Sequence, residues 1–195
     1  MSVFAPALGA LWRQLEGYGI DPEPLFRKEG IAPEMLYDAG ARVPLERYQR
    51  LDLIAAEASG DPYFGLRGAE YFRPAHLGAL GFAWLASSTL RTAFGRLSRY
   101  ARVIQERLTI DLSEDEQHFY VRINPHISLF NEAIREDGQL AALVKFCRII
   151  ASRNFNPARV CFRQAEPAET AYHYELFRCP IEFGADDTLL VIRLQ

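Results

Sequence analysis

Residues 77–104 read LGALGFAWLASSTLRTAFGRLSRYARVI, and this stretch decides the fold that we expect. Its first ten residues are apolar nearly all round, and Gly78 and Gly81 would allow close approach to a neighbouring segment. Ser87-Ser88 interrupts the apolar run and is a candidate helix cap. Apolar residues then recur at helical steps: Leu90, Phe94, Leu97, Ala101 and Ile104. The stretch therefore predicts a helical hairpin whose second, amphipathic helix ends near Gln105.

Upstream of this stretch, the sequence predicts four more helices separated by short breaks. Two of them begin at an aspartate followed by proline, Asp21-Pro22 and Asp61-Pro62, which is a capping signal. Pro44 begins a longer helix that Ser59-Gly60 should end. The first helix carries one apolar stripe: Leu8, Leu11, Trp12 and Leu15. Residues 1–60 are thus expected to form a helical N-terminal subregion of a single domain covering 1–195.

Downstream, the apolar pattern changes to a period of two. Apolar and polar residues alternate at 108–112 and again at 118–123, with the polar stretch SEDEQ between them. This predicts a β-hairpin with one buried face. Further elements follow: a helix from about Asn131 to Arg153, a strand RVCFR, a helix over 167–177, a candidate short strand IEF and a strand TLLVIR. The expected fold class is α+β, with a helical N-terminal half packed on a small mixed sheet from a ββαβαβ C-terminal half.

The composition is that of an ordinary globular domain, with 195 residues of which 49% are hydrophobic. A chain of this length can bury a substantial core and enclose a ligand pocket. The net charge of −3 does not favour binding to DNA or to an anionic membrane. Three cysteines without a CxxC pair predict reduced thiols. No signal-peptide pattern or long apolar segment is seen, so a cytoplasmic location is expected.

We find no catalytic constellation in the sequence. It has no GxSxG elbow, no glycine-rich phosphate loop and no HExxH motif. The four histidines occur singly and lack metal-ligand spacing, so neither a metal nor another cofactor is expected. The acidic residues between the two hairpin strands are interpreted as a solvated turn. An enzyme is therefore not expected, and a small cytosolic hydrolase using cysteine or histidine is a remote alternative.

Arginines line the polar side of the long helix in the opening stretch and just beyond it: Arg91, Arg96, Arg99, Arg102 and Arg107. A solvent-exposed face is favoured over DNA reading, because no neighbouring Lys, Asn or Gln completes a base-reading surface. Some of these arginines could pair with the acidic turn or with an anionic ligand.

Aromatic and polar residues near the hairpin are the candidates for a ligand pocket. Core packing is the default interpretation of Phe82 and Trp84, but pockets also have aromatic walls with a few polar groups. His76 either caps the start of its helix or contacts a ligand, because imidazole offers both a donor and an acceptor. The candidate ligand-binding set is His76, Phe82, Trp84, Tyr100, Tyr120 and Arg122.

The opening stretch is similar to a segment in the N-terminal domains of a large subgroup of AraC-type bacterial transcription regulators, often labelled arabinose-binding-like. The shared features here are Leu77-Gly78, Leu80-Gly81, Ser87-Ser88, Thr89-Leu90 and Arg99-Tyr100. The segment DPYFGLRGAEYF also matches, and so do Pro157-Ala158-Arg159-Val160, Tyr172, Phe177, Cys179-Pro180-Ile181 and Phe183-Gly184. The resemblance spans nearly the whole chain.

The resemblance implies an effector-sensing or dimerisation domain whose regulator binds promoter DNA through a separate C-terminal helix-turn-helix domain. We expect this chain to lack that domain, to bind a small metabolite of unknown identity and to form a homodimer. A solute in a cavity between the helices of 77–105 and the sheet would support sensing. The alternative is a ligand-independent dimerisation or interaction module, with Leu8, Trp12 and Leu15 as candidate contacts.

Overall fold

The computed structural model describes residues 1–124 and 132–194, and it has the expected α+β architecture. The helices are α1 (Gly9–Gly17), α2 (Pro22–Lys28), α3 (Leu45–Ser59), α4 (Phe64–Tyr71), α5 (Ala79–Leu85), α6 (Leu90–Ile104), α7 (Glu132–Ile150) and α8 (Ala171–Phe177). The strands are β1 (Ser2–Phe4), β2 (Arg42–Pro44), β3 (Thr109–Glu114), β4 (His118–Asn124), β5 (Arg159–Cys161), β6 (Ile181–Glu182) and β7 (Thr188–Arg193). Short 3-10 helices cover Ala5–Leu8, Pro33–Tyr37 and Pro74–Leu77.

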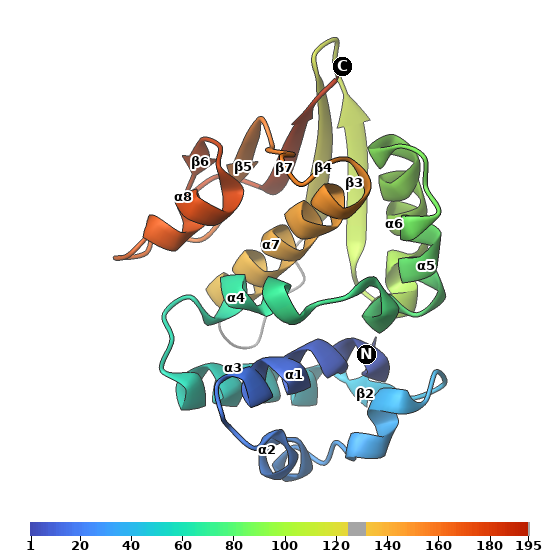
Figure 1. The fold of residues 1–195 in the computed structure, drawn as a ribbon, viewed down its shortest axis with the longest axis vertical. Helices are drawn as coiled ribbons and strands as arrows, with labels where there is room; N and C mark the ends of the chain where they lie inside the picture. The colour runs from blue at the N-terminus through green and yellow to red at the C-terminus, as the bar shows by residue number, and fades with distance from the viewer. Residues whose placement is uncertain (125–131, 195) are drawn as a thin grey trace.

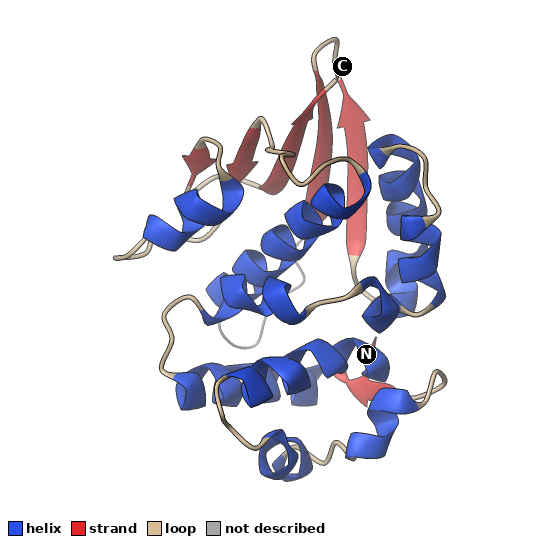
Figure 2. Ribbon diagram, in the orientation of Figure 1, coloured by secondary structure: helices blue, strands red, loops and turns tan. Residues whose placement is uncertain are grey.

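The main sheet is mixed and has the strand order β3-β4-β7-β5-β6 (Figure 2). Strands β3 and β4 form the predicted antiparallel hairpin, while β5 and β6 run parallel. The alternation in β4 is also confirmed, because Phe119, Val121 and Ile123 are buried. Helices α6 and α7 supply much of the core against this face. The small sheet of β1 and β2 was not predicted, since three-residue strands show no period.

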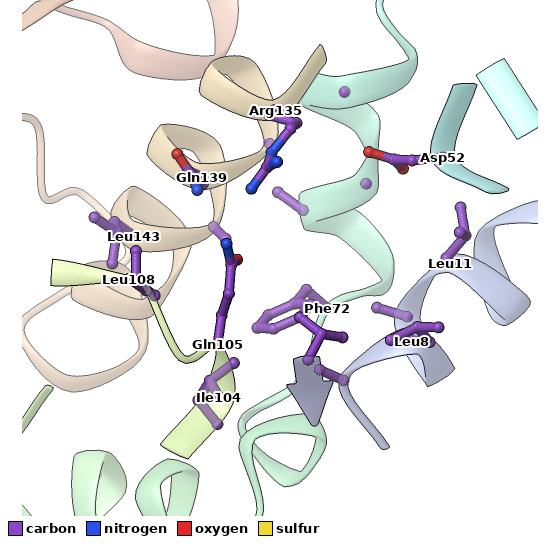
Figure 3. A pocket seen from close by; sticks show the side chains of 18 of the residues that line it. Leu8, Leu11, Asp52, Phe72, Ile104, Gln105, Leu108, Arg135, Gln139 and Leu143 are labelled. Atoms are coloured by element: carbon purple, nitrogen blue, oxygen red, sulfur yellow. The ribbon is translucent and has the colours of Figure 1, made fainter. Parts of the chain in front are cut away.

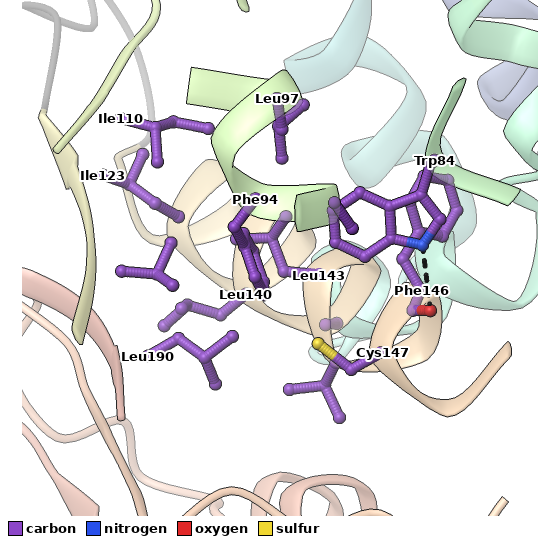
Figure 4. Packing of buried hydrophobic residues seen from close by; sticks show 14 of the residues in the cluster. Trp84, Phe94, Leu97, Ile110, Ile123, Leu140, Leu143, Phe146, Cys147 and Leu190 are labelled. Carbon is purple, nitrogen blue, oxygen red and sulfur yellow. Dashed lines mark hydrogen bonds between the residues drawn. The ribbon is translucent and has the colours of Figure 1, made fainter. Parts of the chain in front are cut away.

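The space between the α5–α6 hairpin and the sheet is filled by buried apolar side chains, aliphatic and aromatic (Figure 4). Trp84 is 2% exposed, packs edge-on against Phe94 at 5.0 Å between ring centroids, and donates from Nε1 to the Phe146 carbonyl at 3.1 Å. The predicted core role of Trp84 is therefore confirmed. The core interpretation of Phe82 is wrong, because this residue is 64% exposed.

A second cluster of buried apolar residues belongs to the N-terminal helices, which form a separate layer in Figure 1. It includes Leu8 and Leu15, which are 1% and 0% exposed. Trp12 packs edge-on against Phe26 at 5.0 Å. The suggestion that this stripe is a dimer contact is thus corrected, since its side chains form an internal core. Helix α4 joins the layers through its contacts with α1 and α7.

Most predicted helix boundaries are confirmed to within two residues, but α7 ends at Ile150 instead of Arg153, and α8 begins at Ala171 instead of residue 167. Helix α2 begins as expected, with the Asp21 carboxylate accepting from the Glu23 N–H at 3.1 Å. The cap of α6 is Thr89, whose Oγ1 accepts from the Thr92 N–H at 3.1 Å, rather than the Ser87-Ser88 pair. The predicted start of α7 at Asn131 lies outside the described residues. One helix arginine does pair with the hairpin, since Arg91 lies 2.8 Å from Glu114.

The glycines of the helical hairpin yield a first prediction. A Cβ on Gly81 would lie 1.7 Å from the carbonyl oxygen of Pro74, which is backbone and cannot move aside. We expect Gly81→Ala to lower the free energy of unfolding by at least about 2 kcal/mol, measured by chemical denaturation. Gly95→Ala is the matched control, because its Cβ would meet nothing within 4 Å. Gly95→Ala should raise the free energy of unfolding by about 0.5–1 kcal/mol, because alanine favours the helix more than glycine does. Equal effects of the two substitutions would contradict the close approach of Gly81 to Pro74.

Candidate functional site

A cavity of about 230 Å³ lies between the two core clusters (Figure 3). It is larger than an apolar cavity of about 150 Å³ that holds benzene, and close to the lower limit of ligand pockets at about 300 Å³. A molecule on the order of ten non-hydrogen atoms would therefore fill it. Much of its wall is apolar: Leu8, Leu11, Phe72, Ile104, Leu108 and Leu143.

Polar side chains reach the same cavity from facing helices. Tyr48 and Asp52 are one helical turn apart on α3, and Arg135 and Gln139 are one turn apart on α7. In Figure 3 the Asp52 carboxylate is directed into the cavity, and the Arg135 guanidinium group lies on the side of Gln139 and Gln105. Gln105, which follows α6, directs its amide toward the same region. The cavity therefore has a polar end between α3 and α7 and an apolar remainder.

The polar end is poor in hydrogen bonds. Among the residues that the structure describes, buried Nη1 of Arg135 and buried Nε2 of Gln105 find no hydrogen-bond partner. Asp52 and Tyr48, which line the same end, are half-buried. Buried polar groups in folded proteins nearly always have a partner, so the two unpartnered nitrogens require a ligand or water.

The ionisation of this end follows from burial and from the nearby charges. Burial raises the pKa of Asp52 to about 6, and the positive charge of Arg135 opposes that rise. The negative charge of Asp52 and burial together raise the pKa of Tyr48 above its ordinary value. Near neutral pH the cavity therefore holds an ionised carboxylate and a guanidinium that interact across it, next to an uncharged phenol.

The close approach of α4 and α7 forms one side of the cavity. Gly65 and Gly68 on α4 and Gly138 on α7 all line it. A Cβ on Gly65 would lie 2.4 Å from the Ile134 carbonyl oxygen. Gln14 fills the space beside Gly68 and donates from Nε2 to the Phe64 carbonyl at 2.8 Å. These contacts place the polar residues of α7 opposite those of α3.

The structure does not bring the sequence-predicted ligand residues together, and none of the six lines this cavity. Trp84 is part of the core, whereas Phe82 and Tyr100 are exposed by 64% and 49%. Tyr120 and Arg122 alternate with the buried residues of β4, so they face the opposite side of the sheet. There Tyr120 donates to Asp115 at 2.6 Å and Arg122 pairs with Asp187 at 2.9 Å.

His76 has the capping role that the sequence suggested as one of two options. Its Nδ1 accepts from the backbone N–H of Arg73 at 3.1 Å, at the start of the 3-10 helix Pro74–Leu77. Burial, followed by the charges of Arg13 and Arg73, lowers its pKa to about 4, so the ring is neutral near pH 7 and can accept. Contact of any of the six predicted residues with a ligand stays a prediction.

Sequence reasoning missed the polar residues of the cavity, although one signal was present. Asp52 lies four residues after Tyr48 and three before Ala55, so a carboxylate occupies the apolar stripe of its helix. A charged residue at such a position must be paired or face a cavity. On α7, the apolar residues are distributed around the helix, so nothing in the sequence distinguishes Arg135 from a surface arginine.

The three cysteines are unpaired by disulfides, and two of them, Cys147 and Cys161, are buried. Burial raises the pKa values of Cys161 and Cys179 to about 11, and that of Cys147 higher still, so these thiols are protonated near pH 7. Within the described ranges, no group of His, Cys, Asp and Glu could hold a metal ion. None of the described helices is long and apolar enough to cross a membrane.

Comparison with known proteins places these features in a family context. The family model described as the arabinose-binding domain of AraC transcription regulators, N-terminal, matches residues 19–195. Over 167 residues, the chain is 25% identical to the ornithine utilization regulator of Pseudomonas aeruginosa, which covers 85% of this chain and 49% of that protein. The fold is similar to that of the transcriptional regulator CdpR from Pseudomonas aeruginosa, with a TM-score of 0.64 and 16% identity. That match covers 94% of this chain and 54% of CdpR, so the chain spans about half the length of the relatives it matches.

The raised pKa of Asp52 leads to a prediction about stability. Because the pKa is raised in the folded chain from the ordinary value of 3.8 to about 6, the fold loses stability as the pH rises between these two values, and the loss is complete above them. We expect Asp52→Asn to stabilise the ligand-free chain by on the order of 1 kcal/mol at pH 7.5, and by less at pH 4.5. Thermal unfolding at both pH values measures this. The control is Asp187→Asn, which removes an exposed carboxylate paired with Arg122 and should bring no such gain in stability. If Asp52→Asn lowers the stability at pH 7.5, the claim that the Asp52 carboxylate lacks a partner is wrong.

Proposed function

Because the chain belongs to the family of arabinose-binding N-terminal domains of AraC transcription regulators, we propose that it is an effector-sensing domain whose ligand occupies the cavity between its two cores. The observation that carries this proposal is the polar end of that cavity, where buried Arg135 Nη1 and Gln105 Nε2 lack partners. A pocket with apolar walls and a few convergent polar groups is the usual form of a small-molecule site.

The position of the cavity supplies a means of signalling. A ligand at the polar end touches α3 in the N-terminal layer and α7 in the layer that carries the sheet. Such a ligand binds most tightly to the arrangement in which both layers contact it. It therefore raises the population of that arrangement, because a ligand shifts a conformational equilibrium through its different affinities for the two states. The effector thereby controls how the layers are held together, and we propose that this arrangement is what the rest of the regulator responds to.

The remaining steps of regulation are also part of the proposal. Since the chain spans about half the length of its relatives, we propose that promoter DNA is bound by a C-terminal helix-turn-helix domain of the full-length regulator. The relative's name, ornithine utilization regulator, supports a small metabolite as the effector. The α5–α6 hairpin serves as scaffold in this proposal, because Phe94, Leu97 and Ala101 of α6 are buried in the core.

A thermal-shift screen against a library of small metabolites tests the sensing function. We expect at least one compound to raise the melting temperature in a concentration-dependent way, because a ligand of the folded state stabilises it by mass action. Ala142→Leu adds bulk to the cavity wall and should abolish that response while the chain stays folded. Ala58→Leu, on the exposed side of α3, should leave the response unchanged. A response that survives Ala142→Leu would place the ligand elsewhere.

We also propose that the chain forms a homodimer, and the exposed apolar side chains of the α5–α6 hairpin favour this. Phe82 and Leu85 on α5 are 64% and 45% exposed, and Val103 on α6 is 54% exposed. Such side chains are common at protein–protein contacts. Sedimentation should show a dimer that Phe82→Ser weakens and that Tyr37→Ser, at an even more exposed aromatic residue, does not. A dimer that persists in Phe82→Ser would exclude this face.

A further inference from the structure

We infer that the effector is a small zwitterion with an apolar body, whose carboxylate is bound by Arg135 and whose ammonium group is bound by Asp52. This inference rests on the proposed sensing function and names the ligand class of the same cavity. Three observations carry it: the two charged side chains line one cavity, the donors of Arg135 and Gln105 lack acceptors, and the remaining wall is apolar.

Both charged side chains line the same cavity, and they do not form a direct ion pair. Asp52 projects from α3 and Arg135 from α7, and the positive charge of Arg135 acts to lower the pKa of Asp52. A ligand with a single charge would satisfy one of them and leave the other buried without a partner, which is costly. A molecule that carries both charges satisfies the two at once and adds no net charge to the cavity.

The hydrogen-bond donors indicate which end of the ligand lies where. Arg135 Nη1 and Gln105 Nε2 are both buried N–H groups that lack an acceptor. In Figure 3 the amide of Gln105 lies on the same side of the cavity as Arg135 and Gln139. A carboxylate offers two oxygens with several lone pairs, so it is the acceptor that can serve more than one of these donors. The ammonium group then lies toward Asp52, beside the hydroxyl of Tyr48.

The rest of the cavity defines the body of the ligand. Its walls are the aliphatic and aromatic side chains of α1, of Phe72 and of the residues that follow α6. Among the described lining residues, Asp52 is the only acidic one. A second ammonium group, as in ornithine, would have no carboxylate there and would be buried unpaired. The cavity therefore suits a neutral α-amino acid of about ten non-hydrogen atoms with an apolar side chain.

Isothermal titration calorimetry on the 195-residue chain tests this inference with matched probes. The zwitterions are L-leucine and L-phenylalanine. Their counterparts are 4-methylpentanoate and 3-phenylpropanoate, which lack the ammonium group, and 3-methylbutylamine and 2-phenylethylamine, which lack the carboxylate. L-Ornithine is the probe with a second ammonium group. We expect at least one of the two zwitterions to bind about tenfold or more tightly than both of its counterparts and than ornithine.

Two variants assign the charges, and circular dichroism confirms that each is folded. Arg135→Met should weaken the zwitterion and the carboxylate probe about tenfold or more, whereas Asp52→Asn should remove the preference for the zwitterion over that carboxylate. Arg91→Met and Asp187→Asn are the controls, because both residues pair at the surface away from the cavity. These two should bind like the unmodified chain.

The outcomes separate this inference from the sensing function on which it rests. Equal binding of the zwitterion and its deaminated acid, tighter binding of ornithine, or no binding of any probe overturns the zwitterion assignment. Sensing itself still stands if another metabolite raises the melting temperature and Ala142→Leu abolishes that response. If no metabolite in the screen shifts the melting temperature and no probe binds, both the assignment and the sensing function fail.

Discussion

The close contact of α4 with α7 is the constraint on which the site depends. At Gly65 there is no room for a Cβ, because it would lie 2.4 Å from the Ile134 carbonyl oxygen. This contact brings the N-terminal turns of α7 up to the helical layer formed by residues 1–60. It leaves Arg135 and Gln139 at a cavity between two cores, opposite Tyr48 and Asp52. Without it, the polar groups of α3 and α7 would not share one space.

On α7, the polar group without a hydrogen-bond partner faces the cavity, whereas the neighbouring acidic side chains are hydrogen-bonded. Next to Arg135, the carboxylate of Glu136 accepts from the Gln164 N–H at 3.0 Å and from the Thr188 hydroxyl at 2.5 Å. Asp137 accepts from Gln164 Nε2 at 2.6 Å and contacts His173 Nε2 at 3.0 Å. The sheet side of α7 is thus well supplied with partners, whereas the cavity side has a buried guanidinium nitrogen without one. A site for a charged ligand explains that contrast, because the ligand completes what the fold leaves open.

Local signals in the sequence were sufficient for most of the fold but not for the site. Proline, aspartate and glycine signals located α2 and α3, and the period of two located β3 and β4, because these signals depend on neighbouring residues only. The cavity depends on segments that lie far apart in the sequence, namely the α1 and α3 region, α4, residues 104–110 and α7. No local pattern in the sequence says which of their faces meet. Tyr120 and Arg122 illustrate the limit, since the alternation that predicted their strand also turned them away from the buried face.

The central claim is that a small molecule binds between α3 and α7 at Asp52 and Arg135. A crystal structure of the chain with its tightest-binding metabolite tests it most directly. The account predicts ligand density in the cavity, with a carboxylate within hydrogen-bonding distance of Arg135 and an ammonium group within that distance of Asp52. Density for the ligand at another place, such as the outer face of the sheet beside Tyr120 and Arg122, with the cavity holding only water, would contradict it.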